Sequence, residues 1–129
     1  MGSWFGHREN EDQGQNLWTA LTTRNHLNEV LERSESRPQV IFKHSTRCII
    51  SKMVLRNFEE ESTPSDVMDY HLLDLIAHRE VSNAIASDFG VHHQSPQLII
   101  VYKKRAVYDR SHQAISSAEV ESFIKNSLI

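Results

Sequence analysis

The sequence predicts an α/β domain in which a central mixed sheet carries helices on both faces. Three observations support this fold class. Apolar runs of strand length alternate with segments whose apolar residues recur every three or four positions. Residues 40–42 are consecutively apolar, as a strand that is covered on both faces requires. Near the C-terminus, apolar runs at 98–102 and 106–109 flank a basic turn, which indicates a hairpin and an antiparallel edge.

The first half of the chain is expected to form two strand–helix units. A short strand at 17–21 precedes a helix that Thr22 or Thr23 can cap. A proline then blocks further helix, and a strand follows at 39–44. A second helix begins at about Cys48, and its buried side is predicted to contain Ile50, Met53, Val54 and Phe58.

The second half completes the order β-α-β-α-β-α-β-β-α. A strand at 68–76 is followed by a helix from about Arg79, which Gly90 ends as its C′ residue. The hairpin comes next, and residues 116–119, Ser-Ser-Ala-Glu, form a capping box that starts the last helix. Alternating units of this kind favour parallel strands with helices on both faces of the sheet.

Composition restricts the function classes. After a polar tail at residues 1–16, which we expect to be mobile, residues 17–129 are long enough for one domain. The net charge of −3 argues against nucleic-acid binding, and no apolar run is long enough to span a bilayer. We expect no signal peptide, and a single cysteine cannot form an internal disulfide, so a cytoplasmic location is expected.

The only cysteine, Cys48, follows the predicted strand at 39–44 and stands at the start of a helix. Ligands of open α/β sheets collect at the carboxyl ends of the strands. The free N–H groups and the dipole of a helix N-terminus stabilise negative charge, which favours the thiolate form of a cysteine there. We therefore expect a reactive nucleophile. A buried cysteine that packs as a small hydrophobe is the alternative.

Spacing argues against several other cysteine chemistries. A phosphatase needs an arginine six residues after its nucleophile, where this chain has Val54, and a peroxidatic motif needs a proline where Ile41 stands. Zinc needs three or four ligands, and only one thiolate exists; the adjacent His92 and His93 would point apart on an extended chain, so no metal is expected. Papain-like hydrolysis, in which a histidine is the base for a cysteine nucleophile, remains an alternative, because the chain contains 8 histidines.

Ser51 lies about one helical turn after Cys48 and completes a C-x-x-S pattern. Its hydroxyl stands where C-x-x-C proteins have their resolving thiol. A hydroxyl can hydrogen-bond a thiolate but cannot attack a mixed disulfide. The pattern therefore predicts a monothiol exchanger, which accepts a thiol adduct from a client and needs an outside thiol to release it.

Three stretches are distinctive: "FKHSTRCIIS", "YHLLDLIAHREVSNAIASDFGV" and "HHQSPQLIIVYKKRAVYDRSHQAIS". In these stretches the chain resembles a thioredoxin-fold family, the YtxJ-like monothiol bacilliredoxins. Together with "LWTALTTRNHLNEVLE", these stretches cover nearly all of the chain after the tail. The resemblance implies a thioredoxin-like three-layer fold and reduction of mixed disulfides between client proteins and bacillithiol, a small thiol. Bacillithiol would then be a co-substrate, and no bound cofactor is expected.

The resemblance also implies roles for individual residues. Cys48 would be the nucleophile, and Ser51 would occupy the place of the second cysteine in dithiol relatives. The peptide bond before Pro96 would be cis. One departure is Ile49, where the family is expected to have a proline, and the loss of that fixed φ affects how the thiolate is oriented. We assign substrate binding to Thr46, Arg47, Ser95 and Pro96.

Two other functions compete with the oxidoreductase. An iron–sulfur carrier of the monothiol-glutaredoxin type shares the C-x-x-S pattern, although bulky Ile49 would crowd a cluster. The other is a binding module that has kept the fold without catalysis.

Arg47 or Lys43 could bind a carboxylate of bacillithiol. The alternative is that both are ordinary solvated charges. Neither a nucleic acid nor a membrane is expected as a partner, and the sequence predicts no oligomeric state.

Overall fold

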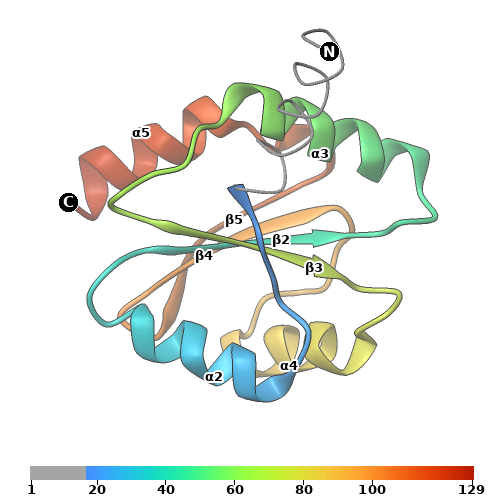
Figure 1. Cartoon of the computed structure of the whole chain (residues 1–129), viewed down its shortest axis with the longest axis horizontal. Coiled ribbons are helices and arrows are strands. Elements are labelled where there is room, and N and C mark those ends of the chain that lie inside the picture. The colour runs from blue at the N-terminus through green and yellow to red at the C-terminus, as the bar shows by residue number, and fades with distance from the viewer. Residues whose placement is uncertain (1–16) are drawn as a thin grey trace, which may run out of the picture.

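The computed structural model describes residues 17–129, which form one sheet between two layers of helices (Figure 1). The elements follow the predicted order, with a short 3-10 helix before the last helix. The mobility expected for residues 1–16 lies outside the described residues. The strands are β1 (Thr19–Ala20), β2 (Gln39–His44), β3 (Asp69–Asp74), β4 (Gln97–Tyr102) and β5 (Arg105–Ser111). The helices are α2 (Arg24–Arg33), α3 (Ile49–Glu61), α4 (Arg79–Phe89), η1 (His112–Ala114) and α5 (Ser117–Ser127).

The five strands lie side by side in the order β1-β3-β2-β4-β5. β1, β3 and β2 are parallel, whereas β4 runs antiparallel to β2 and β5 runs antiparallel to β4. The sheet is therefore mixed, and the late hairpin forms one edge, as predicted. The first strand is shorter than predicted, because only Thr19 and Ala20 pair with β3 at the opposite edge. β2 lies in the centre, so strands flank its C-terminal end on both sides.

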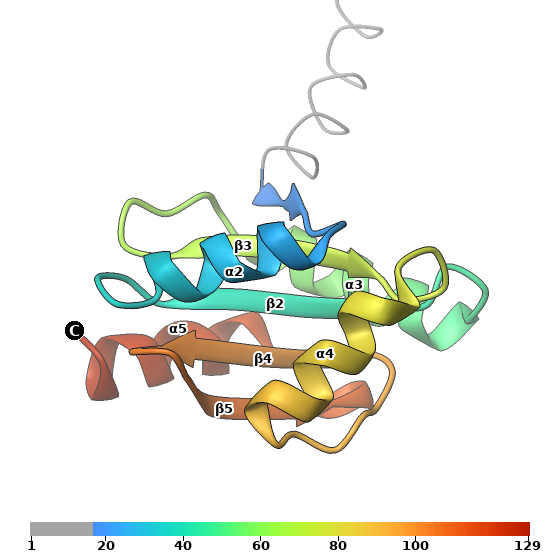
Figure 2. The ribbon, with the colours of Figure 1, turned by 90° about the horizontal axis from the view of Figure 1, so that it is seen from below.

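Each face of the sheet is covered by two helices (Figures 1 and 2). α3 and α5 pack on one face, where their core contains Phe42 and Ile100. α2 and α4 pack on the other face, where the core contains Ile41 and Ile99. Neighbouring residues of β2 thus enter opposite cores, because successive side chains of a strand point to opposite faces.

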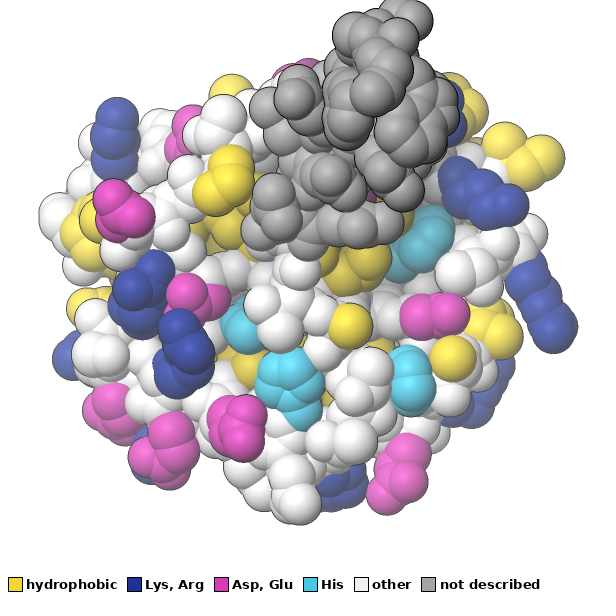
Figure 3. Space-filling model, viewed as in Figure 1, with side chains coloured by type: hydrophobic (Ala, Val, Ile, Leu, Met, Phe, Trp, Pro, Cys, Tyr) yellow, Lys and Arg dark blue, Asp and Glu magenta, His cyan; other side chains and the backbone are white. Residues whose placement is uncertain are grey.

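Charges of both signs are mixed over the surface drawn in Figure 3, where Lys and Arg side chains lie among Asp and Glu side chains. Within residues 17–129, no helix has the length and apolar character that a membrane crossing requires.

α3 presents a different face to the core than its apolar pattern predicts. Val54 and Phe58 are buried as expected, but Ile50 is 48% exposed and Met53 is 60% exposed. The start of α3 lies beyond the end of β2 (Figures 1 and 2), so the sheet offers no apolar surface to its first turn. The residue that is fully buried in this turn is Ser51. The predicted burial of Ile50 and Met53 is therefore wrong.

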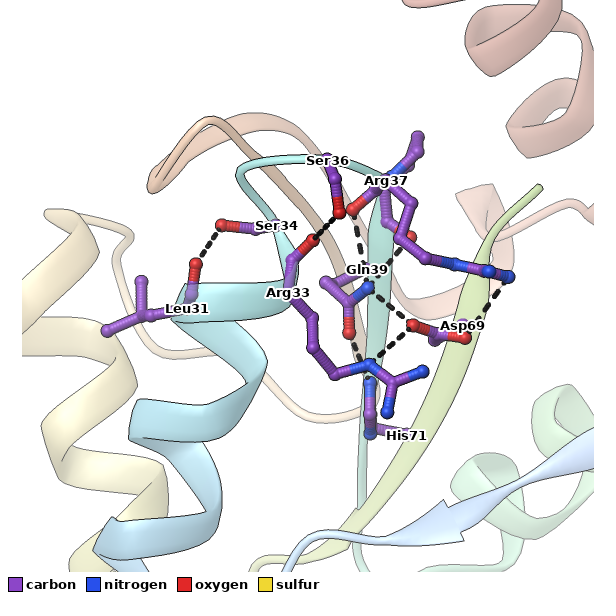
Figure 4. Close-up of polar contacts among 9 residues, drawn as sticks. Leu31, Arg33, Ser34, Ser36, Arg37, Gln39, Asp69 and His71 are labelled. Carbon is purple, nitrogen blue, oxygen red and sulfur yellow. Dashed lines mark hydrogen bonds and ion pairs between the residues drawn. The ribbon is translucent and has the colours of Figure 1, made fainter.

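A partly buried polar cluster lies at the N-terminal ends of β2 and β3, at the opposite end of β2 from Cys48 (Figure 4). Asp69 accepts hydrogen bonds from Gln39 Nε2 at 2.7 Å and from Arg33 Nε at 3.0 Å. It also forms an ion pair with Arg37 at 3.2 Å. Gln39 Oε1 accepts a hydrogen bond from His71 Nε2 at 2.8 Å, and His71 Nδ1 has no partner within the described residues. Burial lowers the pKa of His71 to about 4.

Acid should destabilise the protein through His71. An unfolded histidine has a pKa of 6.5, so between pH 6.5 and about 4 the unfolded chain binds a proton that the folded chain excludes. The free energy of unfolding should therefore fall by about 3 kcal/mol over this range because of this residue. Urea denaturation at neutral and acidic pH measures the fall. It should be smaller in His71→Gln, and an equal fall in both proteins contradicts the prediction.

Candidate functional site

Cys48 is the N-cap residue of α3. Its backbone is extended, with φ −108° and ψ 121°, and its carbonyl accepts a hydrogen bond from Lys52 N–H at 3.1 Å. The side chain is half-buried and makes no capping hydrogen bond. Within residues 17–129, the N–H groups of the next three residues have no backbone acceptor. Their partial positive charge is therefore available to stabilise a thiolate at this position.

Exposed apolar side chains belong to the first two turns of α3. Ile49 is 75% exposed, and Ile50 and Met53 are also exposed. The first turn contains no acidic residue that would offset the helix dipole. The half-buried thiol thus stands next to apolar surface, which suits contact with a partly apolar partner.

The Ser51 hydroxyl is buried and makes two hydrogen bonds. It lies 2.7 Å from His44 Nδ1, and it accepts a hydrogen bond from Ser45 N–H at 3.1 Å. Burial lowers the pKa of His44, and Asp74 opposes this effect only in part. A neutral ring with its proton on Nε2 accepts the serine hydrogen at Nδ1. The single hydroxyl hydrogen is then directed to His44 rather than to Cys48.

The basic residues that were expected to bind a carboxylate occupy different environments. Arg47 is exposed, as is Thr46, and both stand immediately before Cys48 in the turn that follows β2. Lys43 is fully buried, so it is not an ordinary solvated charge. Its ammonium nitrogen lies 2.7 Å from His93 Nδ1, and burial lowers its pKa to about 8.

Ser95 and Pro96 lie in the segment between α4 and β4, and the peptide bond that joins them is cis. The backbone N–H and C=O groups of Ser95 have no hydrogen-bond partner within the described residues. Gln97 holds the preceding residues, because its side chain donates to His92 O at 2.9 Å and accepts from Gln94 N–H at 3.4 Å. This segment lies at the end of the sheet where β2 ends and α3 begins (Figures 1 and 2).

The sequence gives little indication that three polar side chains support this site. They are those of His44, His93 and Gln97. The available signal for His44 is the end of an apolar strand, where Lys43 and His44 interrupt the run. His93 is 50 residues from its partner Lys43, so no local spacing reveals the contact.

A hollow between α2 and the β1–β3 edge contains none of the candidate residues. Within residues 17–129, no three His, Cys, Asp or Glu side chains are grouped as a metal site.

Replacing Ile49 by proline should stabilise the protein. Ile49 is the first residue of α3, where a proline is tolerated, and its N–H has no backbone acceptor within the described residues. The extended backbone of Cys48 is the conformation that a residue before proline prefers. We expect Ile49→Pro to raise the free energy of unfolding by about 0.4–1 kcal/mol, because it restricts the unfolded chain. Urea denaturation measures the change.

Ile50→Pro is the matched control for this substitution. It would place the helical residue Ile49 before a proline, which disfavours helical dihedrals there, so this variant should lose stability. A loss of stability in both variants would contradict the N1 assignment of Ile49.

Residues 19–120 match the model of a protein family described as monothiol bacilliredoxin BrxC. The matched region includes Cys48, Ser51, Ser95 and Pro96 and spans most of the chain.

Solved structures share the fold. A protein described as a candidate oxidoreductase with a thioredoxin fold is 25% identical, with a TM-score of 0.72, over 84% of this chain and 95% of the other. Thioredoxin O2 from Arabidopsis thaliana in its oxidised state is 14% identical, with a TM-score of 0.66, over 89% and 97%. Thioredoxin from Trypanosoma brucei brucei is 14% identical, with a TM-score of 0.67, over 84% and 92%. The predicted thioredoxin-like fold is therefore confirmed.

Proposed function

This chain belongs to the BrxC family of monothiol bacilliredoxins, and from that premise we propose that it reduces mixed disulfides between client proteins and bacillithiol. Cys48 is the nucleophile, and Ser51 stands in the position of a resolving thiol without being able to act as one. Bacillithiol is a co-substrate rather than a bound cofactor. The cytoplasm, where a lone cysteine stays reduced, is the compartment of this activity.

The cycle consists of two thiol–disulfide exchanges. In the first, the Cys48 thiolate attacks the bacillithiol sulfur of the mixed disulfide, forms a Cys48–bacillithiol disulfide and releases the client as a thiolate, which takes a proton from water. In the second, the thiolate of another small thiol attacks the bacillithiol sulfur and releases the Cys48 thiolate. The product is a disulfide of the two small thiols, so the second thiol supplies the electrons.

The placement of Cys48 is the observation that supports this function best. The thiol is accessible at the N-cap of a 13-residue helix whose first turn carries no acid. The chain has no second cysteine, and the Ser51 hydroxyl is engaged with His44 and Ser45. A disulfide formed at Cys48 therefore lasts until an outside thiol arrives.

The substrate is proposed to contact the residues on either side of the thiol. The backbone groups of Ser95, which lack partners in the described part of the chain, suit an extended client segment that pairs as an added strand, with Pro96 directly after it. Thr46 and Arg47 precede Cys48, and the exposed guanidinium of Arg47 suits a carboxylate.

Transfer of a thiol from a client to Cys48 tests the proposal. A client protein carrying one bacillithiol adduct is mixed with the reduced protein, and intact mass spectrometry follows both chains. We expect the client to lose the adduct mass and this chain to gain it. Clients that carry glutathione or cysteine instead show which small thiol is preferred. Retention of every adduct on its client contradicts the proposal, and a coloured cluster after anaerobic purification supports the iron–sulfur carrier.

A further inference from the structure

Lys43 is a buried cation that the exchange steps do not use. Its side chain is fully buried on β2, and within residues 17–129 no carboxylate forms an ion pair with it. Its ammonium nitrogen is 2.7 Å from His93 Nδ1. With a pKa of about 8, the side chain is mostly protonated at neutral pH. A buried charge needs a polar partner, and within the described residues His93 is that partner.

This contact determines how His93 is protonated. An ammonium group has three donors and no acceptor, so Nδ1 of His93 must accept and the ring proton must reside on Nε2. Partial desolvation, followed by the charges of Lys43, Arg79 and His92, lowers the pKa of His93, which favours the neutral ring. The ring is exposed, and its Nδ1 edge is turned to Lys43. The Nε2–H group therefore faces outward as a donor that the neighbouring charge strengthens.

The segment that carries His93 is held at the end of the sheet where Cys48 stands. Lys43 and Gln97 are cross-strand partners in β2 and β4, so their side chains lie on the same face of the sheet. Gln97 binds the backbone of His92 and Gln94, and Lys43 binds the ring between them. Two buried polar side chains thus position this segment directly before Ser95 and Pro96.

The charges around His93 favour an anion. The Lys43 ammonium contacts His93, and the positive charges of Lys43 and Arg79 both lower the pKa of His93. We propose that the Lys43–His93 pair forms a subsite that binds a carboxylate of the small thiol. His93 donates its Nε2–H to the carboxylate, and Lys43 is the positioning residue that keeps this proton on Nε2. In this proposal the carboxylate is held at His93 while the sulfur of the same small thiol reacts at Cys48, so the subsite rests on the proposed function.

A binding experiment tests the subsite without any thiol chemistry. The Cys48→Ser protein is titrated with malate, a dicarboxylate without sulfur, and NMR follows the histidine ring signals at constant ionic strength. The His93 signals should shift saturably, with Nε2 remaining protonated, while the exposed His112 ring should not shift. Lys43→Met in the same background should weaken malate binding about fivefold, the effect expected of one charge-assisted hydrogen bond. The proposal is overturned if malate shifts the His93 and His112 signals equally. It is also overturned if malate shifts the His93 signals no more than sodium chloride does.

A kinetic experiment uses the wild-type protein with a Cys48 adduct of 2-mercaptoethanol, which has no carboxylate and leaves the subsite free. Adduct clearance by 3-mercaptopropionate is compared with clearance by its neutral analogue 3-mercapto-1-propanol, each normalised to its rate with a small aromatic disulfide. The carboxylate thiol should be about fivefold faster, and the preference should fall in Lys43→Met but be unchanged in Lys52→Met, which removes an exposed charge. A ratio of one in the wild type overturns the subsite and leaves the proposed function intact. Failure of both thiols to clear the adduct refutes the proposed function, and the malate titration then decides the subsite alone.

Discussion

Without a second thiol, the wild-type protein should release one equivalent of client for each Cys48 and then stop. The first exchange moves the small thiol to Cys48, and nothing within residues 17–129 can expel it, because Ser51 has a hydroxyl and the chain has no other cysteine. Addition of the small thiol should restore turnover. Quantifying released client thiol with and without added thiol measures both phases. Multiple turnovers without added thiol would contradict the one-equivalent limit.

Cys48→Ser should abolish both phases, with a loss of more than about 1,000-fold, as expected when an enzyme loses its nucleophile. The variant should still fold, because serine is among the preferred N-cap residues and Cys48 occupies the N-cap of α3. Urea denaturation of the variant is the control. An unchanged free energy of unfolding together with lost transfer assigns the effect to chemistry, whereas residual transfer at the wild-type rate would exclude Cys48 as the nucleophile.

Local signals were sufficient to predict the frame of the site. β2 begins and ends at the predicted residues, and α4 starts at the predicted Arg79. A proline before β2, a continuous apolar run and a glycine after α4 are all signals that act within a few residues. The thioredoxin-like fold and the position of Cys48 at a strand–helix junction follow from such signals and from the resemblance.

Contacts between distant residues account for what the sequence did not reveal. The apolar pattern of α3 shows a stripe but not where the sheet ends, so Ile50 and Met53 were predicted to be buried and are exposed. The hydrogen-bond partner of the buried Lys43 side chain is 50 residues away. A hydroxyl at position 51 can hydrogen-bond a thiolate, and the sequence does not reveal that the partner of Ser51 is His44 on the preceding strand. In each case the deciding neighbour belongs to another element.

Ser51→Cys should convert the monothiol into a protein that clears its own adduct. Residues three apart at a helix start have Cβ atoms about 5–6 Å apart, and a disulfide needs about 3.5–4.5 Å, so a small movement joins positions 48 and 51. The new thiol would lie beside His44, whose ring can accept its proton and leave a thiolate to attack the Cys48 sulfur. The small thiol would then leave, and an internal disulfide would remain.

Intact mass over time, without added thiol, distinguishes the two proteins. The Ser51→Cys chain should lose the adduct mass and end two hydrogens lighter than its reduced form, while the wild type keeps the adduct. Ser82→Cys is the matched control, because Ser82 is equally buried but lies on α4; its thiol should leave the adduct in place. The loss of the Ser51 hydrogen bonds should cost Ser51→Cys about 1–3 kcal/mol of stability, which urea denaturation measures separately. If the wild type clears its adduct unaided, or if Ser51→Cys keeps it as long as Ser82→Cys does, Ser51 is not what makes this chain a monothiol.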